Sequence, residues 1–146
     1  MIIKNETQLK QILLAKCKNA LIKTQEQVYQ IINRFVKEFY AEYSPEMYER
    51  TYQLYRSLVK SEIIPTGNGY EAYVYFDLSS IDYVTGRNPS GEQVMQAADY
   101  GRNGAMGLAV ADFKGTSIWY ESLNVLNAEA INTLKRMLIS EGIPIK

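Results

Sequence analysis

Residues 48–58 read YERTYQLYRSL, separated by two residues from Ser44-Pro45, and the chain changes its hydrophobic period there. Before this stretch apolar residues recur every three or four positions, which predicts helix; after it they alternate, which predicts strands. The stretch itself holds three tyrosines and two arginines. Tyrosine side chains are amphipathic and suit a surface that is partly wet and partly docked on another molecule. The order of periods predicts a helical N-terminal third followed by a small sheet.

The first third predicts one long amphipathic helix. Asn5-Glu6-Thr7-Gln8 has the spacing of a capping box, and no glycine or proline occurs within residues 4–43. A continuous helix over that range would be about 55–60 Å long at 1.5 Å per residue. A domain of this size has a radius of gyration of only about 15 Å. We therefore expect that the helix either breaks within polar residues 23–27 or protrudes as a basic arm, residues 1–43.

The remaining segments predict an α+β body over residues 44–146 of a single domain, 1–146. Ser44-Pro45 ends the first helix and can start a short second helix within 46–57. Residues 58–76 predict a β-hairpin around the turn-forming residues 65–69. Residues 117–120 predict a brief strand or turn. Asn127 is expected to cap a C-terminal helix, 128–140, which Gly142 and Pro144 end.

Charge is balanced overall but unevenly distributed. Sixteen basic and sixteen acidic residues give no net charge, which argues against a dedicated nucleic-acid or membrane-surface binder. Residues 1–43 nevertheless carry seven basic residues and four acidic residues. Residues 67–101 carry one basic residue and five acidic residues. A protein with a positive and a negative element can associate head to tail, the geometry that closes rings or extends filaments. The alternative is ordinary surface scatter.

The N-terminus does not resemble a signal peptide, since Met1-Ile2-Ile3 runs straight into polar residues. The longest apolar stretch is far short of the roughly 20 residues that span a bilayer. Cys17 is the single cysteine, so no disulfide can form within one chain. Synthesis in a reducing cytoplasm is expected.

Residues with catalytic chemistry are few. The chain has no histidine, which removes the commonest general base and metal ligand. Cys17 lies on the apolar face of the first helix and is expected to be a buried hydrophobe. The glycine-rich run 101–107 lacks the Lys-Ser/Thr of a phosphate-binding loop. We expect no enzyme, cofactor or metal site. The acidic residues that could form a catalytic pair are scattered: Asp77, Asp82, Glu92 and Asp99.

Protein–protein contact is the function that the aromatic residues favour, because Tyr and Arg are enriched at interfaces. The alternative is that the tyrosines form the core and rim of the domain. The outer face of the first helix is a second candidate surface. The predicted contact residues are Tyr48, Arg50, Tyr52, Tyr55 and Arg56, with Lys16 and Lys23 on the helix.

Several short motifs resemble the gene-product-ten-like "tail component" family, the minor structural proteins of long-tailed bacteriophages at the head–tail junction. The element Arg50-Thr51-x-x-Leu54-x-x-Ser57-Leu58 matches, as does Glu92-x-Val94 leading to Ala97-Ala98 and Gly101. Asn103-Gly104 stands where relatives often have His-Gly. The resemblance covers the chain from about residue 20. It implies an α+β neck or tail-completion protein that assembles into a ring and contacts head-completion and tail-tube proteins in the virion.

Three hypotheses of function follow. The first is a non-enzymatic phage or prophage virion component of the head–tail junction. The second is a small phage-encoded inhibitor of a host defence protein, which would be a monomer or dimer. The third is a hydrolase with two carboxylates, which needs a polar cleft holding both acidic side chains within about 10 Å of each other.

Overall fold

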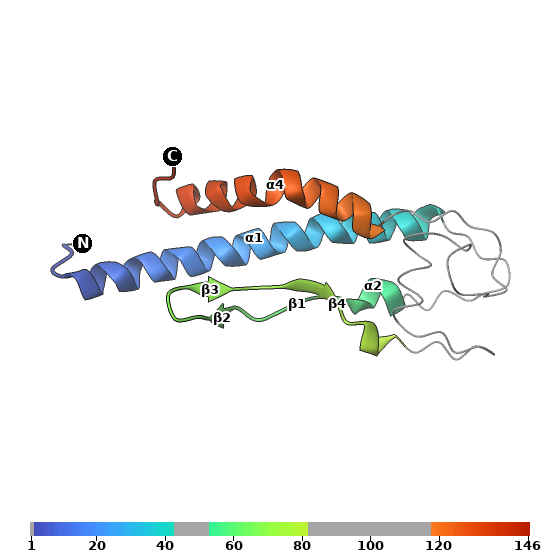
Figure 1. Cartoon of the computed structure of the whole chain (residues 1–146), viewed down its shortest axis with the longest axis horizontal. Coiled ribbons are helices and arrows are strands. Elements are labelled where there is room, and N and C mark those ends of the chain that lie inside the picture. The colour runs from blue at the N-terminus through green and yellow to red at the C-terminus, as the bar shows by residue number, and fades with distance from the viewer. Residues whose placement is uncertain (1, 43–52, 82–117) are drawn as a thin grey trace.

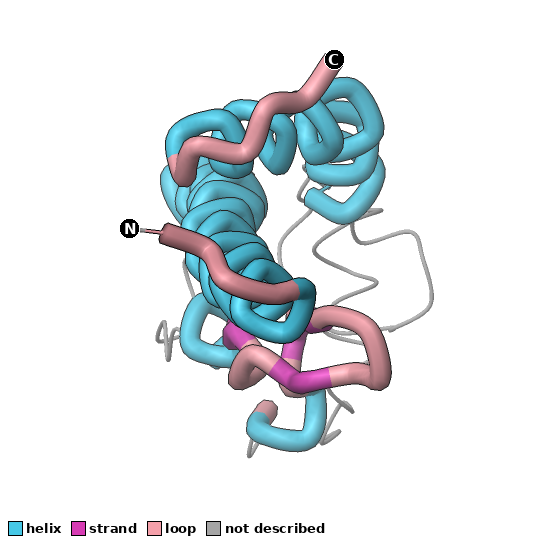
Figure 2. The backbone as a smooth tube through the Cα atoms, turned by 90° about the vertical axis from the view of Figure 1, so that its left-hand side faces the viewer, coloured by secondary structure: helices cyan, strands magenta, loops and turns pink. Residues whose placement is uncertain are grey.

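The long first helix lies between two other layers of the molecule. The computed structural model describes residues 2–42, 53–81 and 118–146. Helix α4 (Ile118–Ser140) runs antiparallel along one side of α1 (Glu6–Glu42), and a narrow β-ribbon lies along the other. Seen along the axis of α1 the order is α4, α1, ribbon (Figure 2). The α+β class predicted from the sequence is confirmed.

Helix α1 is continuous over 37 residues, or about 55 Å. Its predicted capping box is confirmed: the backbone N–H of Gln8 donates to Asn5 Oδ1 at 2.8 Å. The Gln8 amide oxygen in turn accepts from the N–H of Lys4 at 2.9 Å, one residue earlier than in a standard capping box.

The break considered within residues 23–27 does not occur. Polar residues there are the ones through which α1 bonds to both neighbouring layers. Lys23 forms an ion pair with Glu141 after α4, and Gln25 donates to two carbonyls of the ribbon. Glu26 forms an ion pair with Lys60 of the ribbon. These tertiary contacts keep the polar segment helical. The helix is therefore continuous, but residues 16–36 of the predicted arm, 1–43, pack against the other layers, and only its N-terminal part protrudes.

The ribbon is the predicted 58–76 hairpin, divided into two short ladders. Strand β1 (Leu58–Lys60) pairs antiparallel with β4 (Val74–Phe76), and β2 (Ile64–Pro65) pairs with β3 (Tyr70–Glu71). Register Val59↔Tyr75 and Ile64↔Glu71 fixes which side chains share a face. The turn closes with a 2.8 Å bond from the N–H of Thr66 to the carbonyl of Gly69.

Helix α4 begins at Ile118, so the predicted start at residue 128 is wrong, as is the strand or turn over residues 118–120; residue 117 lies outside the described residues. Asn127 is exposed in the middle of the helix and is not its cap. The first turns are stabilised by tertiary packing, since Ser122 is fully buried and Leu126 packs against the core. The predicted end is confirmed. Gly142 has φ +84° and, with Ile143, bonds back to the last turn as in a Schellman motif.

The hydrophobic core lies towards the C-terminal half of α1. It joins that helix to the short helix α2 (Gln53–Ser57), to β1, and to the residue after the 3₁₀ helix η1 (Leu78–Ser80). Within α2 the Ser57 hydroxyl donates to the carbonyl of Leu54 at 2.6 Å. Each large aliphatic side chain buried in this way contributes about 1.5–3 kcal/mol. The core residues are Ile32, Val36, Leu54, Leu58 and Ile81.

Candidate interaction surfaces

The tyrosine-arginine segment predicted as a contact surface is described only in part. Tyr48, Arg50 and Tyr52 lie outside the described residues. Tyr55 is half-buried and packs against the core, while Arg56 is exposed in the last turn of α2. The core position of Tyr55 corresponds to the alternative in which these tyrosines form the core and rim of the domain. Binding through the segment as a whole stays a prediction.

The two predicted lysine contacts of α1 are bonded within the chain. Lys16 Nζ donates to the backbone carbonyl of Glu141 at 2.6 Å, and Lys23 Nζ lies 2.6 Å from Glu141 Oε1. Both lysines therefore stabilise the C-terminal end of α4, where cations are favourable. The hydrogen bond from Lys23 is the main cause that lowers the pKa of the Glu141 carboxyl. Lys23 still has 48% of its side chain exposed, and partner binding by either lysine stays a prediction.

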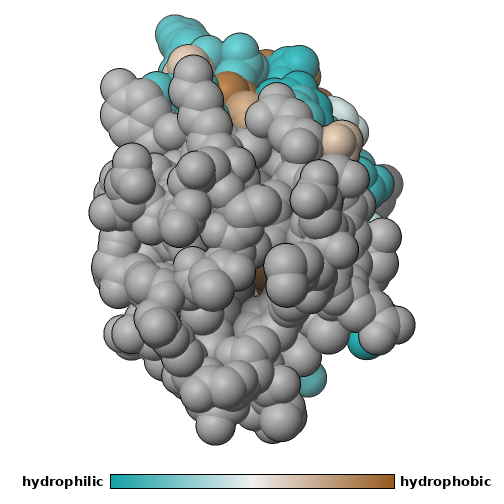
Figure 3. All heavy atoms as spheres, turned by 90° about the vertical axis from the view of Figure 1, so that its right-hand side faces the viewer, coloured by the Kyte–Doolittle hydropathy of each residue, from teal (hydrophilic) through white to brown (hydrophobic). Residues whose placement is uncertain are grey.

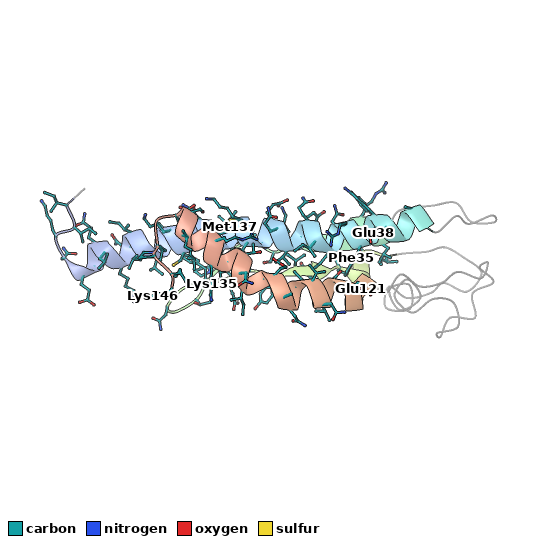
Figure 4. The ribbon with its side chains drawn as sticks, turned by 90° about the horizontal axis from the view of Figure 1, so that it is seen from above. Phe35, Glu38, Glu121, Lys135, Met137 and Lys146 are labelled. Atoms are coloured by element: carbon teal, nitrogen blue, oxygen red, sulfur yellow. The ribbon has the colours of Figure 1, made fainter. Side chains whose placement is uncertain are left out.

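The N-terminal part of α1 extends past both neighbouring layers (Figures 1 and 4). We call residues 2–14 the arm. The hydrogen bond from Lys16 to Glu141 marks where α4 ends, so the arm lies just beyond the end of α4. The arm carries exposed Lys4 and Lys10 against one acidic residue, Glu6. Its exposed aliphatic residues are Ile2, Ile3, Leu9 and Leu13. The N-terminal end of α1 therefore presents a basic and apolar surface.

The ribbon exposes a second apolar surface on the side away from α1. Leu58, Val74 and Phe76 share one face and belong to or pack against the core. Strand alternation turns Tyr73 and Tyr75 to the other face, where they are 51% and 47% exposed. We call this face the ribbon surface; it consists of Ile64, Glu71, Tyr73 and Tyr75.

The ribbon surface has acidic charge. Glu71 is exposed on it, and its negative charge raises the pKa of the Tyr73 hydroxyl, helped by a hydrogen bond between the two side chains. Glu62 is exposed in the segment that joins β1 to β2. The basic residue of the ribbon, Lys60, is directed to α1, where it pairs with Glu26 and lies over the Tyr29 ring. The outward charge of the ribbon is therefore negative, opposite to that of the arm.

The far end of the molecule offers less described surface. Figure 3 views that end, and the described residues visible along its upper edge are mostly hydrophilic. In the view from above, α4 runs obliquely to α1, with Phe35 on the side of α1 that faces it (Figure 4). Sequence reasoning predicted a basic arm from charge and helix length, but assigned it residues 1–43, of which only the N-terminal part extends past the neighbouring layers. It missed the ribbon surface, although the alternation of Glu71, Tyr73 and Tyr75 was a usable signal.

Catalytic geometry is not assembled by the residues that the structure describes. Asp77 Oδ1 accepts a hydrogen bond from Ser79 Oγ at 2.5 Å at the start of η1. The other candidate carboxylates, Asp82, Glu92 and Asp99, lie outside the described ranges, as does the glycine-rich run 101–107. Over residues 2–42, 53–81 and 118–146 no cluster of three or more potential metal ligands occurs, and no helix has the length and hydropathy needed to cross a membrane.

Comparison with known proteins gives one family. The YomN family model matches residues 5–140, nearly the whole chain. No match was found among curated proteins or among solved structures. YomN is a phage-derived family, of the Bacillus phage SPBc2 type. The match therefore supports the phage origin implied by the tail-component resemblance. It does not support membership of the head–tail joining family. The chain belongs to the YomN family and is a phage or prophage protein.

Proposed function

We propose that this protein is a non-enzymatic structural component of the virion, located at the head–tail junction. It acts by associating with itself and by binding head-completion and tail-tube proteins. It is made in the cytoplasm of the bacterial host and is carried in the particle. The observation that supports this most is the arm, a basic and apolar helix end that extends past both layers of the body. Such exposed apolar surface is typical of interaction sites.

The motif that carries the tail-component resemblance has a structural role in the described residues. Leu54, Ser57 and Leu58 are all buried, and they hold α2 and β1 against α1. A motif of core residues indicates a shared fold and does not by itself place contacts on a partner. The proposal for the junction therefore combines the resemblance, the phage family and the exposed arm.

The test is deletion of the gene in the phage or prophage that encodes it, followed by electron microscopy of lysates and mass spectrometry of purified wild-type particles. We expect the protein in intact particles, and separate filled heads and tails in the deletion. Complementation from a plasmid should restore joined particles. Normal virions that lack the protein would overturn the proposal. If those virions also failed on hosts that carry a particular defence system, the inhibitor hypothesis would replace it.

A further inference from the structure

The apolar face of the arm continues an interface that already exists within the chain. Ala20 is completely buried, and Lys16 and Lys23 on either side of it both bond to Glu141. The face of α1 at Ala20 therefore packs on the end of α4. Leu13 lies two helical turns before Ala20 on the same face, and Leu9 lies one further turn away. Both are about two-fifths exposed, 41% and 40%, because α4 has already ended.

The ribbon surface cannot be the occupant of this face in the same molecule. The ribbon packs on α1 through its inner face, and Tyr73 and Tyr75 lie on the opposite face. Contact between the arm and the ribbon surface therefore requires two copies of the chain. Two arms would bring like charges together, since Lys4 and Lys10 dominate each arm. Arm and ribbon instead have opposite charge and comparable apolar side chains.

We propose that the arm of one copy docks on the ribbon surface of the next copy, head to tail, with Leu9 and Leu13 against Tyr73 and Tyr75. Lys10 lies near Glu71 in this contact. The inference rests on the proposed function and specifies the surfaces of its self-association. Because the two surfaces differ, a pair of copies still has one free arm at one end and one free ribbon surface at the other, and repetition produces a filament or closes a ring.

The contact is small. The aliphatic residues of one arm would pack on two tyrosines and Ile64 of the next copy. The surface area buried in this contact is less than the roughly 1,000 Å² expected of an interface that is stable by itself. Association of the purified protein should therefore be weak and concentration-dependent. Opposite charge assists it, so association should weaken as salt is added.

Directed cross-linking tests the geometry. The native cysteine is first replaced, Cys17→Ala, and Leu9→Cys and Tyr73→Cys are made as separate proteins. Each is mixed with an equal amount of the other, under mild oxidation at high protein concentration. We expect a Leu9–Tyr73 disulfide dimer in the mixture and little dimer from either protein alone. Gln27→Cys, exposed on α1 beyond the arm, is the matched control partner and should not cross-link to Leu9→Cys.

Charge reversal tests the same contact without cysteines. Lys10→Glu and Glu71→Lys should each weaken association about two- to fivefold by sedimentation, the range of an exposed ion pair. The double variant should recover wild-type association. Rapid cross-linking of Leu9→Cys with itself would overturn the inference, as would a strict monomer at all concentrations. A protein that is monomeric yet present in virions and required for joined particles would refute the contact and leave the proposed function standing.

Discussion

The side-chain amide of Gln25 donates a 2.9 Å hydrogen bond to the backbone carbonyl of Tyr73, 48 residues away. The same nitrogen donates at 2.9 Å to the carbonyl of Ser61 on the opposite strand. Ser61 and Tyr73 lie where the ribbon is interrupted between its two ladders. One helix side chain thus bonds both sides of the ribbon where the regular ladder is interrupted, and it holds the ribbon against α1.

Replacement of Gln25 should loosen the ribbon. Gln25→Ala removes both bonds, one partly buried and one exposed, and we expect the free energy of unfolding to fall by about 1–2 kcal/mol, the usual range for two net hydrogen bonds. Urea denaturation measures this change. Gln27→Ala, two residues along and exposed, is the control and should alter stability by less than about 0.5 kcal/mol. Equal effects of the two substitutions would contradict the bridging role.

Two buried serines should respond in opposite ways to removal of the hydroxyl. Ser57 and Ser122 are both completely buried. Ser57 Oγ donates to the carbonyl of Leu54, whereas Ser122 Oγ has no hydrogen-bond partner among the described residues. Ser57→Ala should cost about 1 kcal/mol, and Ser122→Ala should be neutral or stabilising, because an unpaired buried hydroxyl is itself unfavourable. Thermal unfolding of the two variants side by side decides this, and a larger loss for Ser122→Ala would show that its hydroxyl is paired.

Gly142 should resist substitution. Its φ of +84° is a conformation that side chains with a Cβ disfavour, and an added Cβ would lie 3.2 Å from Lys16 Nζ. Gly142→Ala should therefore destabilise the protein by about 1 kcal/mol. Gly67→Ala in the ribbon turn, where an added Cβ meets nothing within 4 Å, is the comparison. If the two variants unfold at the same urea concentration, the left-handed cap does not contribute as argued.

Stability should decrease in acid through the ion pairs of α1. The hydrogen bonds from Lys23 to Glu141 and from Lys60 to Glu26 lower the pKa of each carboxyl below its ordinary 4.5. A lowered folded-state pKa stabilises the fold above the unfolded-state pKa, and that contribution is lost as pH falls through the folded-state pKa. The unfolding free energy should thus drop below about pH 4.5.

Glu141→Gln should make that decline shallower, as urea titrations between pH 3 and 7 would measure. Glu62→Gln serves as the control, since Glu62 is exposed in the connection between β1 and β2. A decline that is as steep in Glu141→Gln as in the wild type would place the acid-sensitive groups elsewhere.

Local sequence signals predicted the parts of the fold that local chemistry determines. Asn5 and Gln8 identified the start of α1, residues 65–69 the ribbon turn, and Gly142 the end of α4. Where tertiary contacts decide, prediction failed or stayed open. Residues 118–127 mix aromatic and polar residues without a clear period, and they are helical because Ser122 and Leu126 pack inward.

The sequence predicted the charge of the candidate interaction surface, but it did not predict which of its residues are bonded within the chain. Counting lysines indicated a basic first helix, but it did not distinguish Lys16 and Lys23, which bond to Glu141, from Lys4 and Lys10 on the arm. That distinction depends on where α4 ends, which is a long-range property of the fold. The same holds for the ribbon surface, whose outward tyrosines are defined only once α1 covers the other face.

The continuity of α1 has a consequence for any assembly in which the arm takes part. Residues 6–14 of the arm belong to the same unbroken helix as the part of α1 that packs on α4 and the ribbon, and these two layers lie on fixed sides of that helix. The arm therefore has no hinge on which to swing, and its direction is set within each chain. Successive copies joined through the arm would meet at one angle. The structure of a single molecule would therefore determine the curvature of the assembly and the number of copies in a closed ring.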